Sequence, residues 1–181
     1  MYANHPSELV QQAFAFAKAA HEAVGQVRKY TGEPYIVHPV EVADIVQTVA
    51  HTEVMLAAAL LHDTVEDTGV TMDEIRQLFG HEVADLVEML TDVSVPTDGN
   101  RAVRKAIDRA HTARASAAGK TIKLADLISN TQSIVANDPG FARIYLREKA
   151  SLMDVLREGD PDLWASANRL LQEGLRTLKL A

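Results

Sequence analysis

The sequence predicts an all-α fold in one domain over residues 1–181, with about eight or nine helices. Apolar residues recur at intervals of three and four along most of the chain, as expected of helices with one buried face. No stretch alternates apolar and polar residues over the length of a strand. Glycine and proline fall in short clusters between the periodic segments, where they indicate loops.

The composition is that of an ordinary globular protein. Hydrophobic residues make up 47% and charged residues 24% of the chain, which is long enough to bury a sizeable core. Because there is no cysteine, neither disulfides nor thiolate metal sites are expected, which suits the cytoplasm. The N-terminal MYANHPSELV has no signal-peptide pattern, and no apolar run approaches the roughly 18 residues that cross a membrane.

The first helix is expected to begin after Ser7, whose side chain can cap it, and to bury a stripe from Val10 to Val24. Gly32 and Pro34, within RKYTGEPYIVHP, cannot both lie inside a helix and break that pattern. We therefore expect a loop there.

The next helices are marked by proline, glycine and capping residues. Pro39 suits the first position of a helix over VEVADIVQTVA, and a second apolar helix is expected near residues 53–64, ending within LLHDTVEDT. Thr71 and Glu74 form a capping box in TMDE, which begins a short helix that Gly80 closes. The helix after it stops before the loop SVPTDGN.

Four more helices are expected in the remainder of the chain. A basic helix covers about residues 100–117, and after an interruption at Gly119 a helix runs through KTIKLADLISNTQSIV to NDPG. The last two helices are expected near residues 141–158 and 161–178, with Pro161 in the first turn of the second.

Charge is unevenly distributed along the chain, whose net charge is −7. From Glu53 to Asp92 there are ten acidic residues and one basic residue, and from Arg101 to Lys123 there are seven basic residues and one acidic residue. Two solvated faces explain such asymmetry equally well. The sharper interpretation is an acidic cation site facing a basic wall for a polyanion, as a metal-dependent enzyme acting on a phosphorylated substrate requires.

A group of polar residues stands out at the end of an apolar helix. His62 and Asp63 follow the run LAAALL, so the chain leaves the core there. Glu66 lies four residues after His62, and Asp67 lies four after Asp63, so each pair shares a helix face. Because an unpaired buried charge is costly, either this segment surfaces into solvent or a cation lies against it.

Three more polar residues complete the group. Asp126 lies inside the apolar helical segment IKLADLI with Asn130 one turn later, and His38 ends the loop before a helix. Two imidazoles and two carboxylates would make a mixed nitrogen and oxygen site that suits manganese above all, then zinc, iron or magnesium. Taken singly, His38 is better explained as a loop histidine and Asp126 as a surface acid, but the full combination favours a metal site.

With these motifs the sequence resembles the HD-domain metal-dependent phosphohydrolases, which implies an HD-type helical bundle. It resembles more closely the alarmone hydrolase half of the Rel/SpoT proteins and the small stand-alone alarmone hydrolases. The matching segments are GQVRKYTGEPYIVHP (25–39), AALLHDTVEDT (58–68), KLADLISN (123–130) and, for the small stand-alone group, GNRAVRKAIDRAH (99–111). They follow the order and spacing of the family.

The resemblance implies a metal site with an acidic pair beside it. In such a family the usual ion is Mn²⁺, and the matching metal ligands are His38, His62, Asp63 and Asp126. Glu66 and Asp67 match the pair that handles water and proton transfer.

The resemblance also implies a set of substrate-binding residues. These are Arg28 and Lys29 beside the pyrophosphate, Asn130 near the nucleotide, Tyr145 against the base, and Lys105 with Arg104 at the substrate phosphates. Taken alone, the basic pair also fits a solvated loop, and Tyr145 also fits a packing residue of a helix.

The implied reaction removes the 3′-pyrophosphate of guanosine tetra- or pentaphosphate (ppGpp or pppGpp), the alarmone of the stringent response, to give GDP or GTP and pyrophosphate. Two alternatives stay open. The same site chemistry suits an adenosine alarmone, NADPH or a nucleoside monophosphate, and a non-catalytic sensor would bind the alarmone without cleaving it. Against the sensor, all four ligands and both acids are present.

The match has one departure and leaves the assembly open. Many long family members have a basic residue after KLAD, where this chain has Leu127, so base contact and regulation are not carried over. The hydrolase-like region uses nearly the whole chain, so synthetase activity is not expected.

The expected partner is a small nucleotide, with neither nucleic acid nor membrane. Apolar residues near the last helix suit either a homodimer surface or the core: Leu163, Trp164, Leu178 and Leu180.

Overall fold

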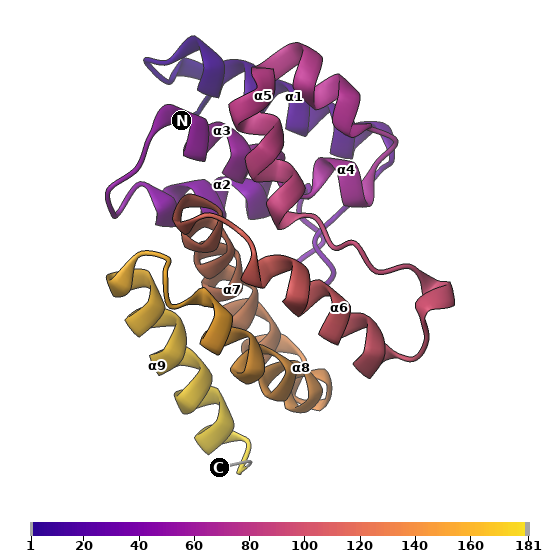
Figure 1. Cartoon of the computed structure of the whole chain (residues 1–181), viewed down its shortest axis with the longest axis vertical. Coiled ribbons are helices and arrows are strands. Elements are labelled where there is room, and N and C mark those ends of the chain that lie inside the picture. Colours follow the sequence, from indigo (N-terminus) through magenta and orange to yellow (C-terminus); the bar gives the residue numbers. More distant parts are fainter. Residues whose placement is uncertain (1, 180–181) are drawn as a thin grey trace. The chain divides into compact units, whose positions relative to one another are not determined.

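The structure is a computed structural model that describes residues 2–179. Within these residues the chain forms nine α-helices and three short 3-10 helices, and the only extended pairing is an isolated bridge between Val27 and Pro34. The all-α prediction is therefore confirmed. The chain divides into two compact units, residues 1–91 and 92–181 (Figure 1).

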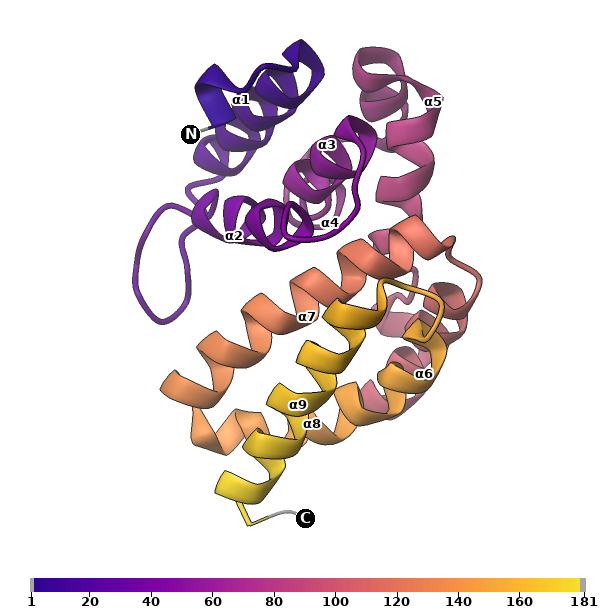
Figure 2. The same ribbon diagram turned by 90° about the vertical axis from the view of Figure 1, so that its left-hand side faces the viewer.

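The first unit is built around one apolar helix. Its elements are η1 (Tyr2–Asn4), α1 (Glu8–Ala23), α2 (Val37–Val46), α3 (Glu53–Leu61), α4 (Thr64–Asp67) and α5 (Met72–Leu90). Residues 55–61 of α3 are all buried, because α1, α2 and α5 each pack against this helix (Figure 2). A helix that is apolar on every side needs neighbours on every side, and α3 has them.

Helix ends in the first unit differ from the sequence prediction at three places. Ser7 stands at the N-cap of α1, but its hydroxyl donates to Glu53 Oε2 at 2.8 Å and makes no capping bond. α2 begins at Val37, so Pro39 is its third residue, still within the turn where no amide donor is needed. The apolar helix ends at Leu61, three residues before the predicted end.

The capping box of α5 is present as predicted, with the Thr71 hydroxyl accepting from the Glu74 amide and the Glu74 carboxylate accepting from the Thr71 amide. Gly80 has φ +82° and interrupts the helical conformation inside α5, a backbone geometry that glycine adopts without a steric penalty. The two predicted helices are therefore two halves joined at this glycine.

The second unit consists of η2 (Pro96–Asp98), α6 (Arg101–Ala113), α7 (Ala117–Asn137), α8 (Pro139–Leu152), η3 (Met153–Leu156) and α9 (Pro161–Thr177). The long helix α7 packs against α8 and α9, which also pack against each other (Figure 2). Leu163 is buried, and the Trp164 indole donates to the Met153 carbonyl at 3.0 Å, so α9 contributes to this core. Leu180 lies outside the described residues.

The predicted interruption at Gly119 is wrong. Ser116 is the N-cap of α7, and its hydroxyl accepts from the Gly119 amide at 3.2 Å, so the glycine lies in the first turn of a helix that begins at Ala117. The helix predicted near residues 141–158 is also shorter, because α8 ends at Leu152 and the chain continues as the 3-10 helix η3.

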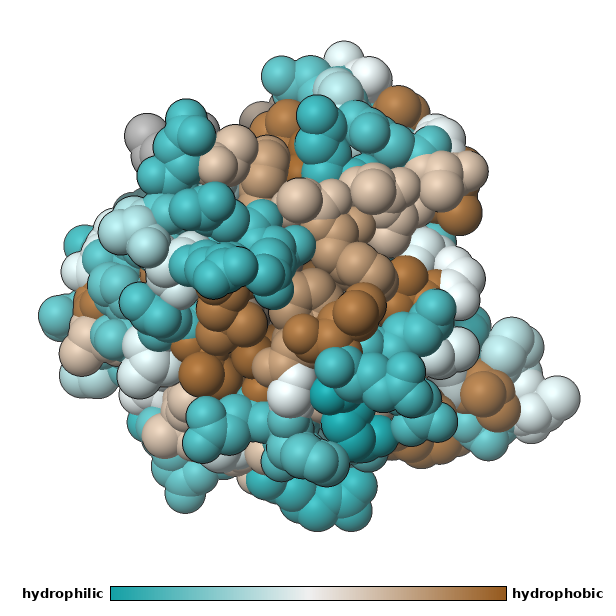
Figure 3. All heavy atoms as spheres, turned by 90° about the horizontal axis from the view of Figure 1, so that it is seen from above, coloured by the Kyte–Doolittle hydropathy of each residue, from teal (hydrophilic) through white to brown (hydrophobic). Residues whose placement is uncertain are grey.

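The surface is mixed. On the face seen from above, apolar residues lie among hydrophilic ones in the middle of the view (Figure 3). Large exposed apolar side chains include Val24, Val27, Leu78, Val103 and Ile144, which come from several separate elements. Among the described helices, none combines the length and the apolar character needed to span a bilayer.

Candidate metal centre and its surroundings

His38, His62 and Asp63 meet where three helices of the first unit begin or end. His38 is the second residue of α2, His62 directly follows α3, and Asp63 is the N-cap of α4. Both imidazoles are at most 2% exposed. The Nε2 atoms of His38 and His62 lie 3.6 Å and 3.1 Å from the two carboxylate oxygens of Asp63. The three helix ends thus bring these three side chains together in one cluster.

The hydrogen bonding of His62 identifies which ring nitrogen is available. Its Nδ1 lies 2.8 Å from the Ala59 carbonyl oxygen, and a carbonyl can only accept, so Nδ1 carries the proton. In the neutral ring Nε2 then presents a lone pair towards Asp63. A lone pair and a carboxylate oxygen facing each other at this distance suit a shared cation. This donor set of two imidazole nitrogens and one carboxylate fits a borderline divalent metal ion.

Tyr35 forms an outer contact to this cluster. Its hydroxyl donates to Asp63 Oδ2 at 2.7 Å, and its ring lies 5.8 Å from the His38 ring and 4.7 Å from the His21 ring. Such a bond to a ligating carboxylate orients it and is a general feature of metal sites. Tyr35 could not be recognised from the sequence, because no local pattern shows that a loop tyrosine reaches a carboxylate 28 positions later.

The acidic pair lies on α4, one turn beyond Asp63, and both Glu66 and Asp67 are exposed. Asp67 Oδ2 accepts a hydrogen bond of 2.8 Å from the Gln26 amide, whose oxygen lies 2.6 Å from His21 Nδ1. His21 is 1% exposed, and burial lowers its pKa, more than the nearby Gln26, Asp63 and Asp67 raise it. A neutral His21 with its proton on Nδ1 therefore fixes the orientation of the Gln26 amide, which in turn holds Asp67.

Neither His21 nor Gln26 belongs to a sequence motif that would reveal this contact. Their connection depends on the turn after α1, where the backbone amide of Gln26 donates to the backbone carbonyl of His21 at 3.0 Å. The predicted basic pair follows in the same loop. The Arg28 amide donates to the Glu33 carbonyl at 2.8 Å, and Lys29 is exposed with its ammonium 4.9 Å from the centre of the Tyr30 ring.

In the second unit, Asp126 is a buried residue of α7. Its Oδ1 accepts a hydrogen bond of 2.6 Å from the Asn130 amide, one turn later, and its Oδ2 lies 3.6 Å from the Lys123 ammonium. The predicted pairing of Asp126 with Asn130 on one helix face is thus present. A buried carboxylate with an amide and an ammonium beside it is held in one orientation.

Tyr145, on α8, is buried with 5% of its surface exposed. Its hydroxyl lies 3.3 Å from the Thr131 hydroxyl, and burial raises its pKa well above the usual range. The ring lies 6.2 Å from that of Phe141, and the Lys149 ammonium lies 5.5 Å from its centre. In this structure Tyr145 therefore packs within its own unit.

The two predicted phosphate-binding residues of the basic helix differ. Lys105 is tied to Asp92 at 2.6 Å and to Asp108 at 3.2 Å, and although burial acts against the charge, these two carboxylates raise its pKa. Arg104 is partly buried, and within residues 2–179 its Nε atom has no hydrogen-bond partner. Lys105 would have to exchange a carboxylate for a phosphate to contact a substrate.

Comparison with known sequences places the chain in a family. Residues 13–144 match the HD domain. A protein of Synechocystis named as a probable guanosine-3′,5′-bis(diphosphate) 3′-pyrophosphohydrolase is 37% identical over 146 residues, covering 79% of this chain and 19% of that protein. The pyrophosphohydrolase of the same name from Aquifex aeolicus is 45% identical over 92 residues, covering 51% and 13%. The chain thus spans less than a fifth of these curated relatives.

Two solved structures are similar to this chain over nearly their whole length. A metazoan ortholog of SpoT, which hydrolyses ppGpp and plays a role in starvation responses, has a TM-score of 0.81 and 30% identity, covering 99% of this chain and 100% of that one. The crystal structure of lmo0812 from Listeria monocytogenes has a TM-score of 0.65 and 28% identity, covering 80% and 99%. An HD domain implies a divalent metal ion, which the donors of His38, His62 and Asp63 fit. The chain belongs to the HD-domain family and is homologous to the ppGpp hydrolases of the Rel/SpoT type.

Proposed function

We propose that the protein is a metal-dependent hydrolase that removes the 3′-pyrophosphate from ppGpp or pppGpp in the cytoplasm, releasing GDP or GTP and pyrophosphate. The observation that carries this proposal is the buried pair of imidazoles whose Nε2 atoms face the two oxygens of one carboxylate. The relatives named for this reaction add support. We take the whole chain, residues 1–181, as one functional HD domain.

The proposed metal ligands are His38, His62, Asp63 and Asp126, and the proposed ion is Mn²⁺. When bound, such an ion supplies positive charge against the phosphate oxygens and makes water a stronger acid. The protein contributes fixed donors: the Ala59 carbonyl sets the tautomer of His62, and Tyr35 orients Asp63.

Glu66 and Asp67 are the proposed proton carriers, one taking a proton from the attacking water and one delivering a proton to the leaving oxygen. Both are exposed on α4, so water and substrate can reach them. The side-chain amide of Gln26 donates to Asp67 Oδ2 at 2.8 Å and so fixes the orientation of that carboxylate. Catalysis of this kind contributes about 10² to 10⁴ in rate.

The proposed substrate contacts are Arg28 and Lys29 at the pyrophosphate, Asn130 and Tyr145 at the nucleoside, and Arg104 with Lys105 at the phosphates. Lys29 is the most accessible of the cations, exposed in the loop between α1 and α2. Arg28 adds the planar fork that binds phosphate oxygens in pairs.

The experiment that tests the function is a product assay on metal-stripped protein, with and without added Mn²⁺. ppGpp is the main substrate, with its adenosine analogue and NADPH run beside it. We expect Mn²⁺-dependent release of GDP and pyrophosphate, lost in Asp63→Ala together with metal binding. Asp73→Ala, an exposed acid paired with Arg76, is the matched control and should retain both. Turnover by metal-free Asp63→Ala protein would contradict the assignment.

A further inference from the structure

His21 is a buried histidine of α1 that takes no part in the proposed reaction as described above. The residue is 1% exposed, and its two ring nitrogens have different surroundings. Nδ1 lies 2.6 Å from the side-chain oxygen of Gln26, whereas Nε2 is buried and has no hydrogen-bond partner within residues 2–179. Burial of an unpaired polar atom is unfavourable, so a histidine retained in this position calls for a physical explanation.

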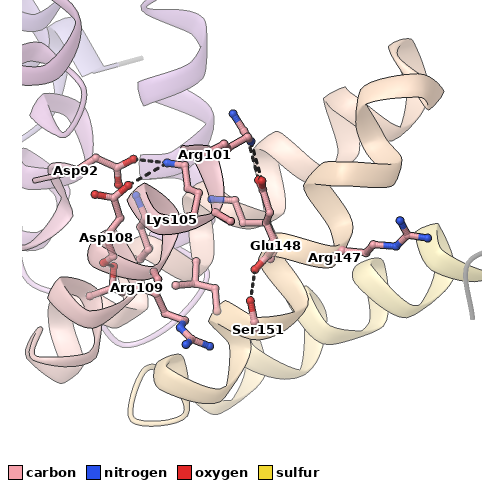
Figure 4. A pocket seen from close by; sticks show the side chains of 14 residues that line it. Asp92, Arg101, Lys105, Asp108, Arg109, Arg147, Glu148 and Ser151 are labelled. Carbon is pink, nitrogen blue, oxygen red and sulfur yellow. Dashed lines mark hydrogen bonds and ion pairs between the residues drawn. The ribbon is translucent and has the colours of Figure 1, made fainter. Parts of the chain in front are cut away.

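A buried polar side chain with a structural role is usually paired, as Asp108 in the second unit shows. Asp108 is 5% exposed and accepts from the Lys105 ammonium (Figure 4) and from the hydroxyl and backbone amide of Ser94. The Nε atom of Arg104 is an exception, and Arg104 is a proposed substrate contact. The unpaired Nε2 of His21 departs from the usual pattern in the same way, and such departures are expected where a side chain serves a functional site.

The hydrogen bonds of Gln26 determine the tautomer of His21. The Gln26 side chain lies between His21 and Asp67, and its nitrogen is 2.8 Å from Asp67 Oδ2. Because an ionised carboxylate can only accept, the NH₂ group of Gln26 faces Asp67 and its oxygen faces His21. Nδ1 of His21 therefore carries the proton. With the proton on Nε2 instead, the Gln26 amide would turn over and present its oxygen to the carboxylate.

Asp67 depends on this contact for its orientation. It is exposed on α4, and within residues 2–179 its side chain has one hydrogen bond, the bond from Gln26. An exposed side chain without such a bond moves among several staggered rotamers. The relay from His21 through Gln26 to Asp67 thus selects one orientation for a carboxylate that is proposed to carry a proton.

The ring of His21 has a second neighbour, Tyr35. The two ring centres are 4.7 Å apart, and the ring planes are inclined by 45°. The Tyr35 hydroxyl donates to Asp63, and its backbone amide donates to the Gln26 carbonyl at 3.2 Å. One buried imidazole therefore contacts both of the side chains that donate to carboxylates of the candidate site.

We propose that His21 is a positioning residue for the hydrolysis reaction: its Nδ1–H holds the Gln26 amide with the nitrogen towards Asp67, and its ring supports Tyr35, the donor to Asp63. A ring that offers Nδ1 to Gln26 from this buried place leaves Nε2 without a partner, which explains the unpaired nitrogen. This inference rests on the proposed function and adds to it a residue that acts through two others.

Two substitutions separate the two contacts. His21→Phe keeps an aromatic ring against Tyr35 but has no donor for Gln26. We expect its kcat for ppGpp to fall about tenfold, less than the roughly 10²-fold that loss of a proton carrier costs, with KM and Mn²⁺ affinity unchanged. His21→Asn keeps an amide donor near the place of Nδ1 but loses the ring. At saturating Mn²⁺ its kcat should return to near that of wild type, while its Mn²⁺ affinity falls about threefold, less than the roughly tenfold effect of losing a direct outer contact.

Stability distinguishes a positioning role from a purely structural one. His21→Phe removes the unpaired nitrogen, so its free energy of unfolding should equal or exceed that of wild type. Ser7→Ala is the control, because it removes a buried hydroxyl that donates to Glu53 in the same unit. It should lower the free energy of unfolding and leave kcat unchanged. A His21→Phe protein that loses stability but retains kcat would overturn the proposal.

A double-mutant cycle tests whether His21 acts through Gln26. Gln26→Leu removes the amide and should lower kcat as much as His21→Phe does. The double variant should fall no further than either single variant, because the two residues act on Asp67 in series. Losses that multiply to about a hundredfold would show independent effects and would overturn the relay.

The tautomer of His21 provides a measurement that needs no turnover. In ¹⁵N-labelled, metal-stripped wild type, NMR correlation of the ring nitrogens with the ring protons should show His21 protonated at Nδ1. Protonation at Nε2 would overturn the proposal whatever the kinetics. Failure of the hydrolase proposal is recognised separately, as an absence of turnover by wild type with Mn²⁺ bound. The tautomer and the Mn²⁺ affinity of His21→Asn would then still decide whether His21 arranges the two carboxylates.

Discussion

At the residue scale, two hydrogen-bonded pairs extend from the candidate site into the loop between α1 and α2. Tyr35 donates to Asp63, and Gln26 donates to Asp67 while its oxygen faces His21. Each pair joins a neutral donor to a carboxylate with a proposed chemical role. Their geometry predicts separable effects, one on metal affinity and one on turnover.

Tyr35→Phe removes only the hydroxyl that donates to Asp63 at 2.7 Å. We expect metal affinity to fall about 10- to 100-fold, the usual effect of losing such an outer contact. Titration of metal-stripped protein with Mn²⁺ measures it. Tyr30→Phe, in the same loop, is the control and should bind Mn²⁺ as wild type does. An unchanged affinity in Tyr35→Phe would show that the hydroxyl does not orient a ligand.

Gln26→Glu keeps an oxygen for His21 but cannot donate to Asp67. It also places a carboxylate where the Gln26 amide now lies, 2.8 Å from Asp67 Oδ2. We expect kcat for ppGpp to fall about tenfold, less than the roughly 10²-fold that loss of the proton carrier itself would cost, with metal content unchanged. Steady-state kinetics and elemental analysis measure the two quantities. Gln12→Glu, exposed on α1, should retain wild-type kcat. A change confined to metal content would contradict this role.

At the element scale, helix packing and capping explain where sequence reasoning succeeded and where it did not. The sequence predicted a helix at each long helix of the described residues, although α5 was expected as two. The polar residues at the end of α3 were recognisable because their type conflicts with the apolar run before them. Gly119 was misjudged because its place in the first turn depends on the Ser116 hydroxyl. Tyr35 and Gln26 escaped notice because their roles arise from contacts between segments distant in sequence, which no local pattern encodes.

Gly159, between η3 and α9, lies where a methyl group would meet the backbone of α7. A Cβ there would be 2.8 Å from Leu124 Cδ1 and 3.1 Å from the backbone of Lys120 and Thr121. We expect Gly159→Ala to lower the free energy of unfolding by about 1–3 kcal/mol through overpacking. Urea denaturation measures it. Gly140→Ala, with only an ordinary contact in the first turn of α8, should be neutral or slightly stabilising; similar losses in both variants would refute the packing argument.

The charged network of Asp92, Lys105 and Asp108, in α6 and the segment before it, predicts a pH-dependent stability. Although burial pushes the pKa of Asp108 up, hydrogen bonds from Ser94 and Lys105 outweigh it and hold that pKa below its usual value. Ionised Asp108 therefore stabilises the folded protein fully above about pH 3.9, the pKa of an aspartate in the unfolded chain. This stabilisation is lost as the pH falls through the lower pKa that Asp108 has in the folded protein. Because the pKa of Lys105 is raised, Lys105 stays charged and keeps its ion pairs until the pH becomes strongly alkaline.

Asp108→Asn should accordingly lower the free energy of unfolding by about 1–3 kcal/mol at pH 7, because a charge-assisted bond is weakened and Lys105 loses a partner. The difference from wild type should shrink as the pH falls below about 4. Urea denaturation at a series of pH values measures both. Asp85→Asn, an exposed acid of α5, is the control. A difference that grows towards acid pH would have the wrong sign for this network.

At the scale of the whole molecule, the proposed metal site makes the free energy of unfolding depend on the concentration of metal ion. A ligand that binds only the folded protein raises the free energy of unfolding by about 2.7 kcal/mol at a concentration of 100 times its Kd. We expect Mn²⁺ at that excess to stabilise wild type by this amount, and to stabilise Asp63→Ala and Asp126→Ala little. Urea denaturation of metal-stripped protein, with and without Mn²⁺, provides the measurement, and Asp73→Ala should respond as wild type does. Asp126 is the stricter test, because among the described residues it is the proposed ligand that lies in the second unit. If Mn²⁺ stabilised Asp126→Ala as strongly as wild type, the ion would be held without that carboxylate, and the four-ligand proposal would have to be abandoned.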